Sequence, residues 1–132
     1  MKDSRLIEIK GLIKRFPMGA GEFTALNSID ITFKRGEFAG VVGPSGSGKT
    51  TLLNIIGSLD TPSEGEVVVL GNSVGDLNHR EAARLRLEHI GFIFQTYNLL
   101  PVYNVFENVE FPLLLLKMDA SRRRKAVLDA IE

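Results

Sequence analysis

Two stretches near the amino terminus alternate apolar and polar residues. Residues 7–10 read IEIK and residues 28–33 read SIDITF, which is the two-residue period of a strand with one buried face. Residues 18–22 between them read MGAGE, and two closely spaced glycines favour a loop. The pattern therefore predicts a small antiparallel sheet at the front of the chain.

The hydrophobic pattern changes in the next part of the chain. Residues 38–42, 66–70 and 90–94 are short, mostly apolar runs, which are typical of strands covered on both faces. A glycine-rich loop follows the first run, and an apolar helix is predicted over about residues 50–57. Strands that alternate with helices in this way predict an α/β fold with a mostly parallel sheet.

Three later segments are predicted to be helices, and each has a recognisable start or interruption. They comprise residues 79–88, 105–116 and 122–131. Asn78 can cap the first helix, and Glu81 three residues later completes a capping box. Pro112 is predicted to kink or split the second helix. Asp119 or Ser121 can cap the third.

The composition excludes several classes of protein. The 132 residues include 16 Lys and Arg, 16 Asp and Glu and no cysteine, so the formal net charge is zero. Balanced charge argues against a protein built mainly to hold nucleic acid. The lack of cysteine leaves no disulfide framework and no thiolate metal site. With 44% apolar residues and no net charge, the chain is expected to fold as one domain rather than to be disordered.

No stretch of the chain predicts insertion into a membrane. A bilayer span needs about 20 apolar residues, whereas the longest unbroken apolar run near the carboxyl end is Leu113–Leu116. The amino terminus lacks the apolar segment of a secretory signal. We therefore expect a cytoplasmic protein, peripheral on the inner face of the membrane, whose membrane contact is made through a partner.

Residues 43–50 read GPSGSGKT and match the phosphate-binding loop pattern G-x-x-x-x-G-K-[ST]. The loop lies between a predicted strand and a predicted helix, which is the context that this motif needs. Glycines let the backbone bend so that successive N–H groups point inward as an anion nest. The positive end of the following helix adds to the attraction for phosphate. The alternative is a glycine-rich turn that binds nothing.

The last residues of the motif supply the charge and the metal ligand. Lys49 offers an ammonium to the outer phosphates of a nucleoside triphosphate, and Thr51 can donate to the inner phosphate. The Thr50 hydroxyl can ligate Mg²⁺, which prefers hard oxygen ligands. Each hydrogen bond to a charged oxygen contributes about 1.5–3 kcal/mol, so the loop by itself supports roughly micromolar binding.

Two long segments resemble the ATP-binding subunit of an ABC transporter. They are residues 43–67 (GPSGSGKTTLLNIIGSLDTPSEGEV) and residues 90–115 (IGFIFQTYNLLPVYNVFENVEFPLLL), and the resemblance covers nearly the whole chain. Within this family, the branch that serves lipoprotein release and macrolide-type export is the most similar. The resemblance implies an α/β, P-loop NTPase (RecA-like) core with an amino-terminal antiparallel β-subdomain and the start of a helical subdomain, truncated.

The resemblance further implies that residues 1–132 are the amino-terminal part of one ATP-binding domain. In that division residues 1–36 are the antiparallel β part, residues 37–95 the P-loop core, and residues 96–132 the start of the helical subdomain. The family implies a dimer of two such subunits with ATP at the interface, and a transmembrane permease that the dimer drives.

The resemblance also implies the residues of the nucleotide site. Gln95 matches the glutamine that touches Mg²⁺ and the attacking water and senses the transporter partner, and Phe16 resembles the aromatic residue that stacks on adenine. The alternatives are a polar residue leaving a strand for Gln95 and a core residue at the sheet edge for Phe16. The nucleotide-binding residues so implied are Phe16, Gly43, Pro44, Ser45, Gly46, Ser47, Gly48, Lys49, Thr50, Thr51 and Gln95. Thr50 and Gln95 are also expected to bind Mg²⁺.

Two segments after Gln95 correspond to the region that meets the coupling helix of the membrane subunit. They are residues 97–101 and 105–109, and an ordinary core role suits their apolar side chains equally well. The basic run at residues 122–125 is expected to be the solvated face of a helix, with binding of nucleic acid or lipid headgroups as the alternative.

Several motifs of the family do not occur among the 132 residues: the LSGGQ-like signature, the Walker B strand ending in Asp-Glu, and the switch histidine. Hydrolysis needs a positioned water and a well-anchored metal. We therefore expect this chain to bind MgATP without turning it over, and we assign no catalytic residue. The alternatives are a non-catalytic module that binds nucleotide or permease, a soluble ABC protein, and a GTPase or small-molecule kinase. The GTPase motifs D-x-x-G and N-K-x-D are absent.

Overall fold

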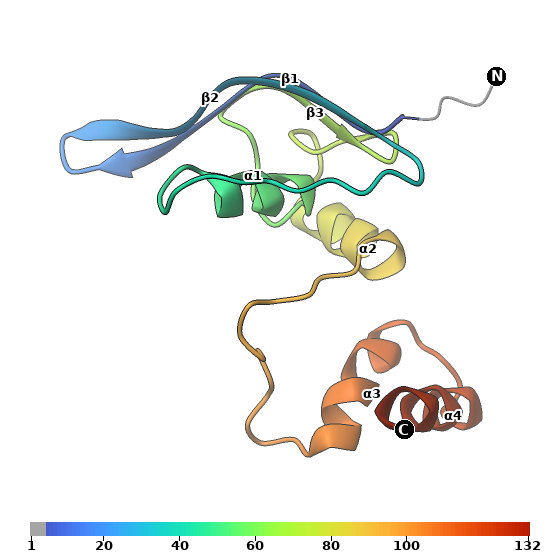
Figure 1. Cartoon of the computed structure of the whole chain (residues 1–132). Helices are drawn as coiled ribbons and strands as arrows, with labels where there is room; N and C mark the ends of the chain where they lie inside the picture. Colours follow the sequence, from blue (N-terminus) through green and yellow to red (C-terminus); the bar gives the residue numbers. More distant parts are fainter. Residues whose placement is uncertain (1–4) are drawn as a thin grey trace. The chain divides into compact units, whose positions relative to one another are not determined.

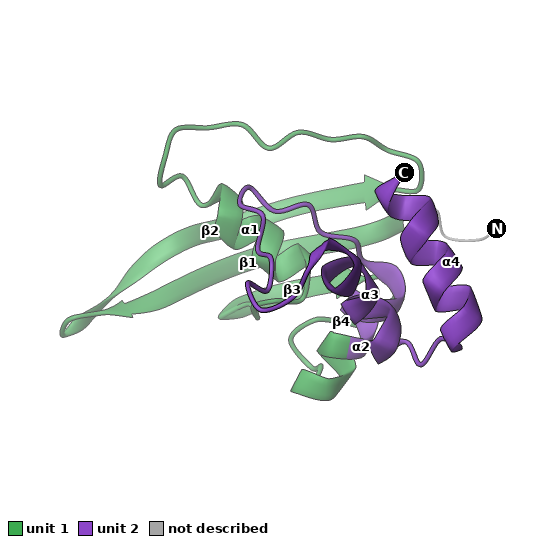
Figure 2. Ribbon diagram, turned by 90° about the horizontal axis from the view of Figure 1, so that it is seen from below, with its two compact units in different colours: residues 1–83 green, residues 84–132 purple. Residues whose placement is uncertain are grey.

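The computed structural model describes residues 5–132 and divides the chain into two compact units, one ending at Ala83 and the other beginning at Arg84. Figure 2 draws the two units in green and purple. The first unit holds the sheet and the phosphate loop, and the second holds the helices nearest the carboxyl end. No helix in the described part of the chain is long and apolar enough to cross a membrane.

The first unit is built on a sheet of four strands, β1 (Arg5–Met18), β2 (Gly21–Lys34), β3 (Glu64–Val69) and β4 (Asn72–Ser73). Their order across the sheet is β2-β1-β3-β4, and every pairing among the described residues is antiparallel. The predicted antiparallel sheet is confirmed, with a tight turn at residues 19–20 that joins β1 to β2. Because β1 lies between β2 and β3, it is the strand around which the core forms.

A bulge in β1 changes which residues face the core. Ile9 and Leu12 are both buried although they lie three residues apart, and the pairing of β1 with β2 shifts register between them. Gly11 in this bulge has φ +57°, and the β3 backbone approaches so closely that a Cβ on Gly65 would overlap the Gly11 carbonyl oxygen. An extra residue in one strand reverses the alternation beyond it, so Leu12 becomes a core residue.

One helix, α1 (Lys49–Ile56), packs against this sheet. Figure 1 shows α1 along one face of the curved sheet, and its side chains Leu52 and Ile55 are buried. Gly57 ends the helix, and its N–H donates to the Leu53 carbonyl at 2.8 Å. The predicted helix over about residues 50–57 is confirmed, and its buried face holds the phosphate loop beside the sheet.

The predicted strands at residues 38–42 and 90–94 are wrong for this structure. Both segments have irregular backbone, and the side chains of Phe38 and Ile93 are fully exposed. A strand exists only through hydrogen bonds to a neighbouring strand, and an apolar sequence does not supply that neighbour. Residues 5–132 contain no parallel strand pair, contrary to the prediction. The predicted strand at residues 66–70 is confirmed as β3.

Three helices follow β4 in the chain. They are α2 (His79–His89), α3 (Val105–Leu115) and α4 (Ala120–Ile131), and each lies within two residues of its predicted bounds. Pro112 lies inside α3, which continues as one helix and is not split. In the second unit α3 packs beside α4, and the Arg123 guanidinium donates to the Glu110 carboxylate at 2.7 Å.

The predicted helix caps are confirmed. The Asn78 side-chain oxygen accepts the Glu81 N–H at 3.0 Å, and the Glu81 carboxylate accepts the Asn78 N–H at 3.0 Å, which is the reciprocal pair of a capping box. At the start of α4 the Asp119 carboxylate accepts from the Ser121 hydroxyl at 2.7 Å. This bond, together with the Arg122 N–H, lowers the pKa of Asp119. A carboxylate at this helix end thus stays ionised and caps α4.

Candidate functional site

The phosphate loop places its lysine inside the loop. Lys49 is the first residue of α1, and its ammonium donates to the Gly43 carbonyl at 2.8 Å and to the Pro44 carbonyl at 2.6 Å. The Ser47 hydroxyl oxygen lies 3.4 Å from the same nitrogen. The side chain is therefore folded back over residues 43–47, and its positive charge lies where an anion held by the loop would need it.

Two glycines of the loop lie in crowded places, and at Gly48 a side chain does not fit. A Cβ on Gly43 would lie 2.7 Å from the Ser47 hydroxyl oxygen. Gly48 has φ +88°, and a Cβ there would lie 2.7 Å from the Ala25 carbonyl oxygen and 2.8 Å from a Leu26 methyl carbon. The loop thus bends tightly over itself at Gly43 and rests on β2 at Gly48, which the sequence pattern alone did not indicate.

The start of α1 leaves backbone donors for an anion. Gly48 is the residue before the helix and offers no side-chain oxygen to cap it. The first N–H groups of any helix have no acceptor within the helix. With no acidic residue in its first turn, α1 presents these donors and the positive end of its dipole without a competing negative charge.

An open pocket of about 540 Å³ joins the loop to the hairpin formed by β1 and β2. Phe16 and Phe23 line it from the hairpin, where they are directly paired across the two strands. Residue Phe16 is 37% exposed and residue Phe23 is 50% exposed. The remaining lining residues are Ala25, Ser45, Gly46, Gly48, Lys49, Thr50 and Thr51. One pocket therefore contains a cationic, amide-rich end and an aromatic end.

Most of the residues that the sequence analysis singled out come together at this pocket. Phe16, Lys49, Thr50 and Thr51 line it together with three more residues of the loop, whereas Gly43, Pro44 and Ser47 shape the loop itself. Sequence reasoning missed Phe23 and Ala25. The signal for Phe23 was available, because it lies as far after the hairpin turn as Phe16 lies before it.

Gln95 belongs to the other compact unit and lies exposed in a bend. Its predicted contact with Mg²⁺ therefore stays a prediction. In the segment after it, Tyr97, Leu99, Leu100 and Val102 are exposed, so they are not core residues of the described structure. Within the described residues, no cluster of three or more His, Cys, Asp or Glu side chains forms a metal site.

Comparison with known proteins gives consistent matches. The family model described as ABC transporter matches residues 26–132. The uncharacterized ABC transporter ATP-binding protein MJ0796 of Methanocaldococcus jannaschii is 42% identical over 130 residues, which cover 96% of this chain and 55% of that protein. The macrolide export ATP-binding/permease protein MacB of Photorhabdus laumondii is 43% identical over 123 residues, which cover 92% of this chain and 19% of that protein.

Solved structures agree with the sequence matches. A dimeric structure of a post-hydrolysis state of the ATP-binding cassette MJ0796, bound to ADP and Pi, superposes with a TM-score of 0.87 at 42% identity. The match covers 93% of this chain and 54% of that chain. The present chain therefore spans about half the length of this cassette, and its fold class is the one that the sequence analysis predicted.

Proposed function

This chain belongs to the ABC transporter family as an ATP-binding component, and we propose that it binds MgATP through residues 43–51 to power a membrane permease. The observation that carries the proposal is the position of Lys49, whose ammonium is held inside the loop by the Gly43 and Pro44 carbonyls. An ammonium bonded to loop carbonyls can exchange them for phosphate oxygens, which bind it more strongly because they are charged.

The residues of the pocket fit a nucleoside triphosphate with Mg²⁺. The tight bend at Gly43 and the close approach of Gly48 to β2 shape the loop, which would offer backbone N–H groups and the Lys49 ammonium to the phosphates. Thr50 would offer its hydroxyl to Mg²⁺, and the ion would neutralise charge between the phosphates. Phe16 would take the base on its ring, which is the apolar end of the same pocket. Gln95 is proposed as a second contact to Mg²⁺.

The partners in this proposal are a second ATP-binding subunit and a transmembrane permease. The solved cassette MJ0796 is described as dimeric, and MacB is named as an ATP-binding/permease protein for macrolide export. By analogy, the present chain would work on the cytoplasmic face of the membrane in export or lipoprotein release.

Calorimetric titration tests the nucleotide part of the proposal. MgATP is expected to bind the chain with a Kd of roughly micromolar order, because several charge-assisted hydrogen bonds act together. Adenosine, which lacks phosphates, is expected to give no saturable heat at the same concentrations. If MgATP produces no saturable heat up to millimolar concentrations while circular dichroism shows a folded chain, the proposed function is wrong.

Binding to membrane vesicles tests the permease part. Tyr97 is 93% exposed, and Tyr97→Asp is expected to weaken binding to inside-out vesicles that contain the permease by about tenfold, since a buried carboxylate without a partner opposes an apolar contact. The matched control is Ile131→Asp, which adds the same charge at an exposed apolar position of the same unit. Equal vesicle binding by the two variants would contradict a docking role for this segment.

A further inference from the structure

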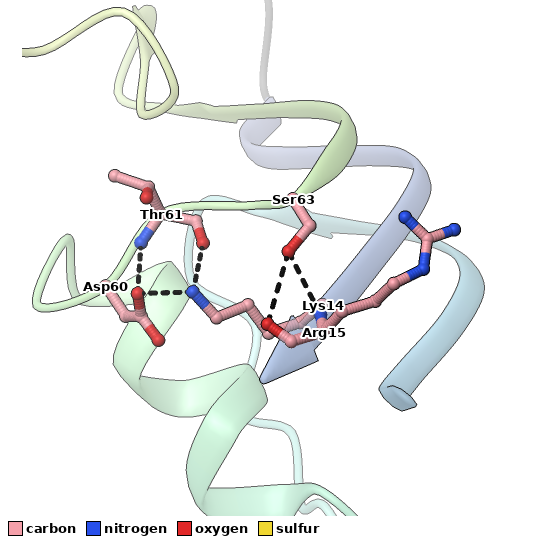
Figure 3. Close-up of polar contacts among 5 residues, drawn as sticks. All are labelled: Lys14, Arg15, Asp60, Thr61 and Ser63. Carbon is pink, nitrogen blue, oxygen red and sulfur yellow. Dashed lines mark hydrogen bonds and ion pairs between the residues drawn. The ribbon is translucent and has the colours of Figure 1, made fainter. Parts of the chain in front are cut away.

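Lys14 of β1 is a buried lysine that has two acceptors of its own. Only 11% of its side chain is exposed, and its ammonium donates to the Asp60 carboxylate at 2.6 Å and to the Thr61 carbonyl at 2.9 Å. Figure 3 shows the side chain reaching from β1 to this pair. A buried ammonium is stable only when it is paired, so the side chain is confined to one place.

The same ammonium lies 5.0 Å from the centroid of the Phe16 ring. This distance is within the range in which a cation is attracted to an aromatic face. Phe16 is also the aromatic residue that lines the pocket beside the phosphate loop. Lys14 therefore contacts the ring that is proposed to take the base. Phe16 itself remains 37% exposed.

Asp60 connects this contact to the helix that carries the phosphate loop. It lies just after α1, and the N–H groups of Leu59 and Asp60 donate to the Asn54 carbonyl at 2.8 and 3.3 Å. The Asp60 oxygen that binds Lys14 also accepts the Thr61 N–H at 2.7 Å. The ion pair thus ties the carboxyl end of α1 to the strand that carries Phe16.

Neighbouring backbone bonds strengthen the same connection. The Ser63 N–H donates to the Ile13 carbonyl at 2.9 Å, and the Ser63 hydroxyl accepts the Arg15 N–H at 3.0 Å, as Figure 3 shows for the second bond. Residues 13–15 are therefore held to residues 60–63 on both sides of Lys14. These other bonds hold the backbone in place without the Lys14 side chain. The Lys14 ammonium contacts the Asp60 carboxylate and the Phe16 ring.

We infer that Lys14 is a positioning residue for nucleotide binding: by pairing with Asp60 and lying over the Phe16 ring, it holds the base-binding ring at a set distance from the phosphate loop. A ligand that has both a base and a triphosphate benefits only if the two ends of the pocket keep their spacing. A ligand without a base does not depend on that spacing. The inference rests on the proposed function, since it concerns the same nucleotide.

Titration with two ligands tests the inference. Lys14→Met keeps an unbranched side chain, one atom shorter, and removes its charge. MgATP binding is expected to weaken about three- to thirtyfold, the range of a lost cation–π contact and of looser positioning. Magnesium tripolyphosphate, which has no base, is expected to bind the variant as it binds the wild type. Equal weakening of both ligands, or no weakening of either, would overturn the inference.

A double-mutant cycle with Phe16 separates positioning from a general structural effect. In a Phe16→Ala background, Lys14→Met is expected to cause no further loss of MgATP affinity, because the ring through which it acts is gone. A further loss of the same size would show that Lys14 acts by another route. Lys14→Arg, which keeps the charge, is expected to restore most of the preference for MgATP over tripolyphosphate.

A substitute variant and a wild-type control keep the titration able to contradict the inference. If Lys14→Met does not fold, Asp60→Asn takes its place, since it removes the charge of the partner and keeps an oxygen for the Thr61 N–H. The same selective loss of MgATP binding is expected, and equal loss of tripolyphosphate binding would count against the inference. If the wild-type chain binds neither ligand, the proposed function fails, whereas selective failure in the Lys14 variants concerns the inference alone.

Discussion

Lys49→Ala is expected to weaken MgATP binding by about a hundredfold or more, since it removes charge-assisted hydrogen bonds of about 1.5–3 kcal/mol each. The ammonium already lies inside the loop, 2.6 Å from the Pro44 carbonyl oxygen and 2.8 Å from that of Gly43. Among the residues that the structure describes, no other lysine or arginine lines this pocket, so no neighbouring cation of the described lining can replace it. Isothermal titration calorimetry of the wild type and the variant measures the change.

The control for this substitution is Lys34→Ala. Lys34 is an exposed lysine in the same unit at the end of β2, and it does not line the pocket. Lys34→Ala removes the same formal charge as Lys49→Ala. Its effect on MgATP affinity is expected to be small because exposed charges are screened by salt. The thermal unfolding of both variants should stay close to that of the wild type. An unchanged affinity in Lys49→Ala would refute the assignment of the loop.

Gly48→Ala is expected to destabilise the first unit strongly and to remove nucleotide binding with it. The residue has φ +88°, and the added Cβ would lie 2.7 Å from the Ala25 carbonyl oxygen and 2.8 Å from a Leu26 carbon. A non-glycine residue in this region costs about 1–3 kcal/mol, and overpacking adds about 1–3 kcal/mol. The sum is a large part of the free energy of unfolding of a typical domain, about 5–15 kcal/mol.

Gly19→Ala separates the two contributions. Gly19 lies in the hairpin turn with φ +60°, and a Cβ there would meet nothing within 4 Å. Gly19→Ala therefore measures the free energy lost to a positive φ at a non-glycine residue, without a steric overlap of the added Cβ. Urea unfolding followed by circular dichroism should show a clearly larger loss of stability for Gly48→Ala than for Gly19→Ala. Similar losses in the two variants would mean that α1 moves away from β2 without difficulty.

Local patterns in the sequence predicted the elements whose causes are local. The alternation at residues 7–10 and 28–33 predicted the hairpin strands, and Asn78 with Glu81 predicted the start of α2. In these cases the determining groups lie within a few residues of one another. The motif at residues 43–50 also predicted that a bent loop, a lysine and a helix start would meet.

Features that depend on distant residues were not predictable in the same way. Residues 38–42 have the composition of a buried strand, yet the described structure gives them no pairing partner. The bulge at Gly11, which makes Leu12 a core residue, depends on how closely Gly65 approaches from β3. The pairing of Lys14 with Asp60 joins residues 46 positions apart, and no local period indicates it.

The sequence by itself determined the chemistry of the candidate site: GPSGSGKT specifies a bent backbone, a cation and a hydroxyl at adjacent positions, and an aromatic residue stands in β1. The tertiary structure decided how these groups meet. It brought the hairpin beside the loop, added Phe23 to the pocket and set Lys14 against Phe16. The physical reason is that hydrogen-bonding capacity and charge belong to single residues, whereas spacing depends on strand register, close backbone approach and burial, which arise only when the chain packs.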